Sequence, residues 1–276
     1  VEADNSSAIF FTTNLKVTAY ITSGTTSLVR TETRTAIVPQ TPEAFTWNLD
    51  GNLLSDGLWT NTWDAENRVI HMESVSAVPD SLKRRLDFNY DFQGRRVSKA
   101  VSSWSNNQWT VTSSNIFLYD DRNIIAEVEY TGNQATTNLY CYGLDVSETL
   151  QGAGGIGALL WMVRGPPKEC YAIAHDGQGN IGNLIVSSNG AIAATFDYSP
   201  FGQTLQATGP VAINCPLRFS SKYEDRETRW QNLGQRLYIP SLGRFASADP
   251  IGESGGENRY RFVNNSPLDS VDPFGL

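Results

Sequence analysis

Tyr90-Asp91-Phe92-Gln93-Gly94-Arg95-Arg96-Val97 is the clearest copy of a pattern that recurs along much of the chain. In this pattern an aromatic residue is followed by Asp, a short turn with Gly or Asn, a polar residue and a β-branched or aliphatic run. An Asp side chain can cap a tight turn, and Gly or Asn accepts the positive φ that such a turn needs. The unit is therefore predicted to be a β-hairpin, in which the aromatic residue ends one strand and the aliphatic run begins the next.

Further copies of this repeat keep the same order of residues at regular spacing. They are Trp63-Asp64-Ala65-Glu66-Asn67-Arg68-Val69-Ile70, Tyr119-Asp120-Asp121-Arg122-Asn123-Ile124-Ile125 and His175-Asp176-Gly177-Gln178-Gly179-Asn180-Ile181, with looser versions at Leu49-Asp50-Gly51-Asn52-Leu53-Leu54 and Tyr198-Ser199-Pro200-Phe201-Gly202-Gln203. The aligned aspartates at 64, 91, 120 and 176 are 27, 29 and 56 residues apart, close to one, one and two repeats. Since a single hairpin cannot bury its own face, we expect stacked antiparallel hairpins and an all-β fold. Unrelated hairpins in a β-sandwich are the alternative.

The composition excludes several classes of protein. With 276 residues, of which 40% are hydrophobic and 18% charged, the chain can form one large or two ordinary globular domains. A formal net charge of −8 argues against a nucleic-acid partner or an anionic membrane surface. Cys141, Cys170 and Cys215 have neither the number nor the spacing of a disulfide framework or a metal site. No apolar run has the length of a membrane span.

An Asp-Pro-x-Gly motif occurs twice near the C-terminus, at Asp249-Pro250-Ile251-Gly252 and Asp272-Pro273-Phe274-Gly275. The two aspartates are 23 positions apart, and Arg236 precedes the first by 13. Two facing carboxyl groups can share a proton, so that one acts as a base on water and the other as an acid. An arginine can hold one carboxylate ionised or polarise a carbonyl group. The pattern suggests cleavage of a peptide bond by these three groups, with Leu276 left at the cut end.

Other candidate sites are weaker. Gly152-x-Gly154-x-x-Gly157 formally matches a dinucleotide fingerprint, which requires a preceding strand and a long following helix. Here only six residues, 158–163, come before Arg164-Gly165-Pro166-Pro167, which would end any helix, so a glycine-rich turn is the better interpretation. His71 and His175 are the only histidines, which makes a Ser-His-Asp site or a histidine metal cluster a poor hypothesis. We therefore expect no cofactor and no bound metal.

The repeat and the C-terminal motifs together resemble a known family. The Tyr-Asp-x-x-Gly-Arg unit resembles the YD repeat of Rhs proteins, Tc-toxin C subunits and teneurins, and residues 217–276 resemble the Rhs-associated core domain nearly end to end. The matching stretches are Arg218-Phe219-Ser220-Ser221-Lys222-Tyr223, Pro240-Ser241-Leu242-Gly243-Arg244-Phe245, Asn258-Arg259-Tyr260-Arg261-Phe262-Val263-Asn264-Asn265-Ser266-Pro267 and both Asp-Pro-x-Gly motifs. Departures from the family pattern, such as Ser199 at a repeat Asp position, leave the arginine and both aspartates in place.

The resemblance implies three regions with distinct roles. Residues 1–44 are a β-rich segment without assignment, residues 45–205 are YD-repeat hairpins, and residues 206–276 are an Rhs core domain with a self-cleavage site after Leu276. The hairpins would form part of a spiralling hollow β-shell that the core domain closes. Asp249, Asp272 and Arg236 would act as a single-turnover, intramolecular aspartic-type autoprotease, which releases a C-terminal toxin domain inside the shell.

The resemblance also implies partners and a location. The partners would be the upstream shell portion of the same polypeptide and the toxin domain after Leu276, and the protein would be secreted, or delivered by a bacterial secretion system, to a cell surface or the extracellular space. A start at Val1 without Met, together with an end on a motif, suggests a piece of a longer protein. Two alternatives remain open: a cell-surface YD-repeat adhesion or recognition module, and a structural shell fragment without proteolysis.

Overall fold

The computed structural model describes residues 10–23, 26–39 and 43–276, and its regular elements there are strands and single turns of 3-10 helix. The strands form three antiparallel sheets with two, four and 14 strands, which confirms the predicted all-β fold. The two-stranded sheet is a long hairpin of β1 (Phe10–Ser23) and β2 (Thr26–Pro39). No helix in the described ranges is long and apolar enough to cross a bilayer.

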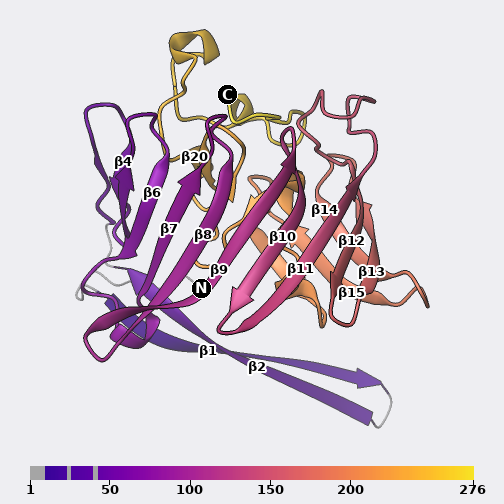
Figure 1. The fold of residues 1–276 in the computed structure, drawn as a ribbon. Coiled ribbons are helices and arrows are strands. Elements are labelled where there is room, and N and C mark those ends of the chain that lie inside the picture. The colour runs from indigo at the N-terminus through magenta and orange to yellow at the C-terminus, as the bar shows by residue number, and fades with distance from the viewer. Residues whose placement is uncertain (1–9, 24–25, 40–42) are drawn as a thin grey trace.

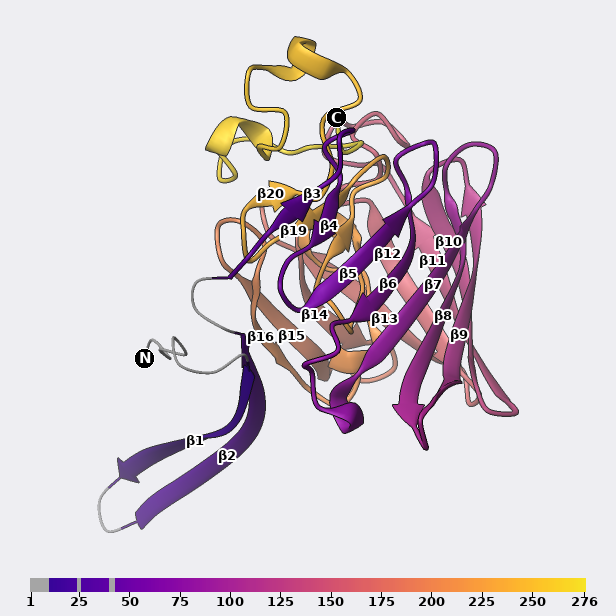
Figure 2. The same cartoon turned by 90° about the vertical axis from the view of Figure 1, so that its left-hand side faces the viewer.

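The 14-stranded sheet is a meander in which each strand pairs with its neighbours in sequence. Its strands are β3 (Thr46–Trp47), β4 (Leu53–Ser55), β5 (Trp59–Trp63), β6 (Val69–Ser74), β7 (Arg84–Tyr90), β8 (Arg96–Ser105), β9 (Gln108–Asp120), β10 (Asn123–Thr131), β11 (Gln134–Tyr142), β12 (Leu159–Gly165), β13 (Glu169–His175), β14 (Ile181–Val186), β15 (Ile192–Tyr198) and β16 (Thr204–Thr208). The sheet runs from β3 at one edge to β16 at the other and is therefore open. Figures 1 and 2 show it arching around the orange part of the C-terminal segment (residues 217–276), whose yellow end lies at one rim of the sheet.

The repeat forms its turns through contacts that lie within five residues. Asp91 Oδ1 accepts hydrogen bonds from the backbone N–H groups of Gln93 and Arg95, Asp91 Oδ2 accepts one from Arg95 Nε at 2.8 Å, and Gly94 has φ +77°. Burial would raise the pKa of Asp91, but Arg95 and the backbone donors lower it below its ordinary value. One copy differs from the expected turn, because Asp121 takes the positive φ while Asn123 pairs with Asp120 in the strand ladder.

At five places in the large sheet, an aromatic side chain donates a hydrogen bond to a backbone carbonyl oxygen of the preceding strand. These bonds run from Trp63 Nε1 to Leu53 O, Tyr90 Oη to Val69 O, Tyr119 Oη to Arg96 O, Tyr142 Oη to Ile124 O and Tyr198 Oη to Ile181 O, all at 2.8 to 3.0 Å. Arginines reach in the other direction, since Arg68 stacks over Tyr90 and Arg95 over Tyr119. The hairpins therefore stack in sequence order.

The C-terminal segment fills the concave side of the large sheet. It contains the small sheet of β17 (Tyr223–Glu224), β18 (Gln231–Asn232), β19 (Leu237–Ile239) and β20 (Arg244–Phe245). The 3-10 turns in the described part of the chain are Asp80–Leu82, Ala212–Asn214, Phe219–Ser221, Gly252–Gly255 and Val263–Asn265. Phe117 and Tyr140 of the large sheet belong to the same buried cluster as Leu217 and Tyr223 of this segment. Since each fully buried large apolar side chain contributes about 1.5–3 kcal/mol, this packing holds the segment inside the sheet.

Candidate functional site

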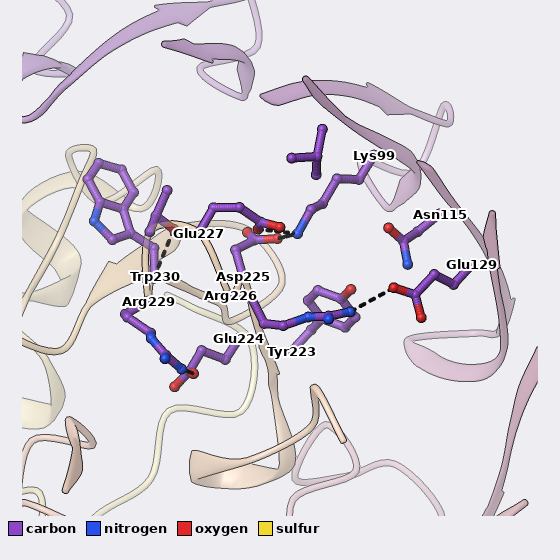
Figure 3. Close-up of polar contacts among 12 residues, drawn as sticks. Lys99, Asn115, Glu129, Tyr223, Glu224, Asp225, Arg226, Glu227, Arg229 and Trp230 are labelled. Atoms are coloured by element: carbon purple, nitrogen blue, oxygen red, sulfur yellow. Dashed lines mark hydrogen bonds and ion pairs between the residues drawn. The ribbon is translucent and has the colours of Figure 1, made fainter. Parts of the chain in front are cut away.

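Buried charges anchor the C-terminal segment to the large sheet. Asp225, only 1% exposed, accepts two hydrogen bonds from Arg96 Nη1 of β8 at 2.8 and 2.9 Å and a third from Lys99 Nζ at 3.0 Å. Lys99 also contacts Glu227 at 2.7 Å, and Arg226 pairs with Glu129 of β10 (Figure 3). These contacts join residues more than ninety positions apart and place the end of the chain over one rim of the sheet.

The three predicted catalytic residues come together at this rim. Arg236 directly precedes β19, Asp249 follows β20, and Asp272 lies in the last turn of the described chain. Both aspartates line one open cleft of about 360 Å³ together with Leu276. The cleft is also lined by Gly255, Asn258, Arg261, Val263, Asn264, Ser270, Val271, Pro273 and Phe274.

Arg236 connects one carboxylate to the peptide segment near Leu276. Its side chain is 2% exposed, and Nη2 contacts Asp249 Oδ2 at 3.0 Å while Nε donates to the carbonyl oxygen of Gly275 at 2.7 Å. Nη1 donates to the carbonyl oxygen of Arg259, and the guanidinium lies 3.7 Å above the Phe245 ring. Burial lowers the pKa of Arg236 despite the two aspartates. All three nitrogen atoms of the guanidinium thus make hydrogen bonds, and these bonds fix the orientation of the side chain.

Asp249 is held by its own turn. Its Oδ1 accepts a hydrogen bond from the backbone N–H of Ile251 at 3.0 Å, and its carbonyl oxygen accepts one from Gly252. Gly252 has φ +64°, which the turn requires. The Asp-Pro-x-Gly motif therefore fixes this carboxylate so that Oδ2 faces Arg236.

Asp272 lies under the peptide segment that follows it. Its Oδ1 accepts hydrogen bonds from the N–H groups of Phe274, Gly275 and Leu276 at 3.2, 2.7 and 3.2 Å. Burial raises the pKa of Asp272, and the three N–H donors and Arg236 only partly oppose this effect. In the described chain, no hydrogen bond is made to Oδ2. The arrangement offers a carboxyl group with a raised pKa in the same cleft as an ion-paired carboxylate, which suits acid–base chemistry on a peptide bond.

The sequence patterns missed two groups that contact the same segment. Lys222 Nζ donates to the carbonyl oxygens of Gly154 and Pro273 at 2.7 and 3.0 Å. The backbone N–H of Gln235 donates to the carbonyl oxygen of Phe274 at 2.9 Å. Lys222 belongs to one of the core-domain-like stretches, but nothing in its local sequence indicates which segment it contacts. Burial lowers its pKa to about 8.

Comparison with known proteins finds several similar sequences, although no protein-family model matches the chain. It is 32% identical over 197 residues to salivary gland surface protein 1 of Aedes aegypti, covering 70% of this chain and 5% of that protein. It is 28% identical over 239 residues to the tRNA3(Ser)-specific nuclease WapA of Bacillus spizizenii, covering 84% of this chain and 9% of that protein. It is 43% identical over 61 residues to toxin protein Tse5 of Pseudomonas aeruginosa, covering 22% of this chain and 5% of that protein. The chain thus spans less than a tenth of these relatives.

The fold is also found in a Tc toxin. A crystal structure of TcdB2-TccC3 superposes with a TM-score of 0.65 at 20% identity, covering 83% of this chain and 11% of that one. This likeness shows that the two proteins share the open antiparallel fold.

Proposed function

We propose that this chain is part of a toxin-enclosing β-shell and that its C-terminal segment hydrolyses its own peptide bond after Leu276. One observation carries the proposal: Arg236 binds both the Asp249 carboxylate and the Gly275 carbonyl oxygen, while Asp272 accepts the Leu276 N–H. The catalytic groups and the segment to be cut are thus held by the same hydrogen-bond network. Residues 206–276 would be the core domain, and residues 45–205 the repeats of the shell wall.

The proposed chemistry is acid–base hydrolysis. Asp249 takes a proton from a water molecule, whose oxygen attacks the carbonyl carbon of Leu276. Asp272 gives its proton to the leaving nitrogen, and the C–N bond breaks to leave a carboxylate on Leu276 and a new amino terminus. This assignment follows from the environments, because Asp249 faces a guanidinium whereas burial raises the pKa of Asp272.

The reaction is expected to be intramolecular. The bond to be cut lies only four residues beyond Asp272, so the chain supplies its own substrate at a high effective concentration. A chain extended past Leu276 by its own downstream sequence should therefore migrate as two pieces on a denaturing gel. The first-order rate constant should not change over a wide range of protein concentration. A rate that rises in proportion to concentration, or an uncut chain, would contradict the proposal.

The rate of self-cleavage should depend on pH in a defined direction. Because Asp272 must carry a proton to act as the acid, cleavage slows as the pH rises through its pKa, which burial places above the ordinary value for Asp. The measurement is the first-order rate constant of the extended chain at a series of pH values. A rate that increases continuously toward alkaline pH would assign the chemistry to another group.

The partner implied by this function is a toxin domain that follows Leu276 in the same polypeptide. Support comes from the toxin names of several relatives, and delivery outside the producing cell is part of the same proposal. The upstream shell portion would extend the sheet at its free β3 edge, because an open edge presents unpaired backbone groups.

A surface recognition module is the second candidate. It is favoured by the similarity to salivary gland surface protein 1, whose name places it at a surface. In that case the Asp-Pro-x-Gly turns would only close the sheet. The extended chain would remain intact, and variants with either aspartate substituted would migrate as the same single full-length band.

A further inference from the structure

The segment proposed to be cut is bound by groups from two different parts of the protein. On one side, the Gln235 N–H and the Arg236 guanidinium bind the carbonyl oxygens of Phe274 and Gly275. On the other side lies the glycine-rich loop of residues 151–157, whose Gly154 carbonyl shares the Lys222 ammonium with the Pro273 carbonyl. Each of three successive carbonyl groups thus has a donor of its own.

We propose that Lys222 and the loop of residues 151–157 form a clamp that positions the Asp272–Leu276 segment for self-cleavage. This inference rests on the proposed function. Lys222 contacts neither carboxylate in the described chain, so its role is positioning rather than catalysis. An error of about 1 Å in the placement of a reacting group can cost a hundredfold in rate, so such a clamp has a measurable effect.

The loop has its own support and does not depend on the segment for its shape. Asp145, 5% exposed, accepts hydrogen bonds from the N–H groups of Ala153 at 2.6 Å and Gly155 at 3.3 Å, and its other oxygen binds Ser147. The N–H of Gly157 donates to Ser221, the residue before Lys222. The loop and the lysine are therefore placed as one unit.

Gly154 allows the loop of residues 151–157 to lie in close contact with the Pro273 carbonyl group and Lys222. It has φ +60°, and a Cβ at this position would lie 2.2 Å from the carbonyl oxygen of Pro273 and 3.1 Å from Lys222 Nζ. Any larger residue must push the segment or the loop away. The segment is also held from the side, because the Arg122 guanidinium lies 4.8 Å above the Phe274 ring.

The matched control is Gly132. Its φ of +57° is nearly that of Gly154, but no atom lies within 4 Å of where its Cβ would be. Gly154→Ala and Gly132→Ala therefore impose a similar backbone cost, and only the first obstructs the clamp. At Lys222, methionine removes the donors and nearly keeps the size, whereas arginine keeps the donors.

The experiment follows cleavage of the extended chain. We expect Gly154→Ala and Lys222→Met to cut about 100-fold more slowly than the unsubstituted chain, Gly132→Ala to cut at the normal rate, and Lys222→Arg to recover part of the loss. The pH profile of Gly154→Ala should keep its shape, because the acid, the base and the charges around them are unchanged. Normal rates in both Gly154→Ala and Lys222→Met would overturn the clamp while leaving the dyad in place.

A second measurement separates the clamp from the cleavage. In residues 1–276, hydrogen exchange at the N–H groups of Gly275 and Leu276 should speed up by at least about tenfold in both clamp variants, but not in Gly132→Ala. The melting temperature shows whether a variant has unfolded. If exchange speeds up but the extended unsubstituted chain is never cut, the self-cleavage proposal fails and the loop is only a tether. Unchanged exchange overturns the clamp.

Discussion

Asp249→Asn and Asp272→Asn should each leave the extended chain as a single uncut polypeptide. Asparagine keeps the shape of the side chain, and its oxygen can still accept the turn hydrogen bonds, but it cannot take or give a proton under these conditions. Loss of a general acid or base costs typically 10²–10⁴-fold in rate, and here both roles serve the same bond. The measurement is the fraction of cut chain on a denaturing gel over several days.

The control for this experiment is Asp269→Asn. Asp269 is exposed, lies three residues before Asp272 and does not line the cleft, so its loss should leave the rate unchanged.

Arg236→Ala should slow or stop the cut, because it removes the contacts to Asp249 and to the Gly275 carbonyl together. If both asparagine variants are still cut after Leu276, another group performs the chemistry.

Asp225→Asn should lower the free energy of unfolding by about 3–5 kcal/mol, the range for breaking a buried ion pair. The substitution leaves the buried Arg96 and Lys99, whose side chains are 2% and 3% exposed, with Glu227 as their one remaining ion-pair partner in the described residues. Denaturant titration of both proteins at neutral pH measures the difference. Asp80→Asn is the control, because Asp80 is 65% exposed where it pairs with Lys83, and such surface pairs contribute about 0–1 kcal/mol.

The stability that Asp225 provides also has a predictable pH dependence. Burial would raise the pKa of Asp225, but Arg96 and Lys99 lower it below its ordinary value. Its contribution is therefore complete above the ordinary pKa of Asp and is lost as the pH falls through the lower pKa of the folded state. The difference in the free energy of unfolding between the unsubstituted protein and Asp225→Asn should become smaller in strong acid. A gap of less than 1 kcal/mol at neutral pH would mean that the segment is held by apolar packing alone.

The hairpins were predictable because their determinants are local. Asp91, Gly94 and Arg95 make a turn from atoms within five residues, and that pattern can be recognised wherever it recurs. The two Asp-Pro-x-Gly turns are equally local, as the contact of Asp249 with Ile251 illustrates. The sequence also indicated which three residues to consider as a catalytic group, since the aspartates repeat one motif and an arginine precedes them.

Tertiary structure alone decided which of these local units meet. Tyr90 Oη reaches a carbonyl 21 residues back, Lys222 reaches one 51 residues ahead, and Arg96 pairs with Asp225 over 129 residues. No local sequence pattern predicts such partners, because which residues meet depends on the path that the intervening chain takes through the fold. The sequence by itself determined the strands, the turns and the candidate catalytic residues of this protein. Only the folding of the C-terminal segment into the concave sheet placed Arg236, Asp249, Asp272 and Lys222 around one peptide segment, since that packing buries apolar side chains of the sheet, such as Leu53 and Phe117, together with Leu217 and Leu237 of the segment.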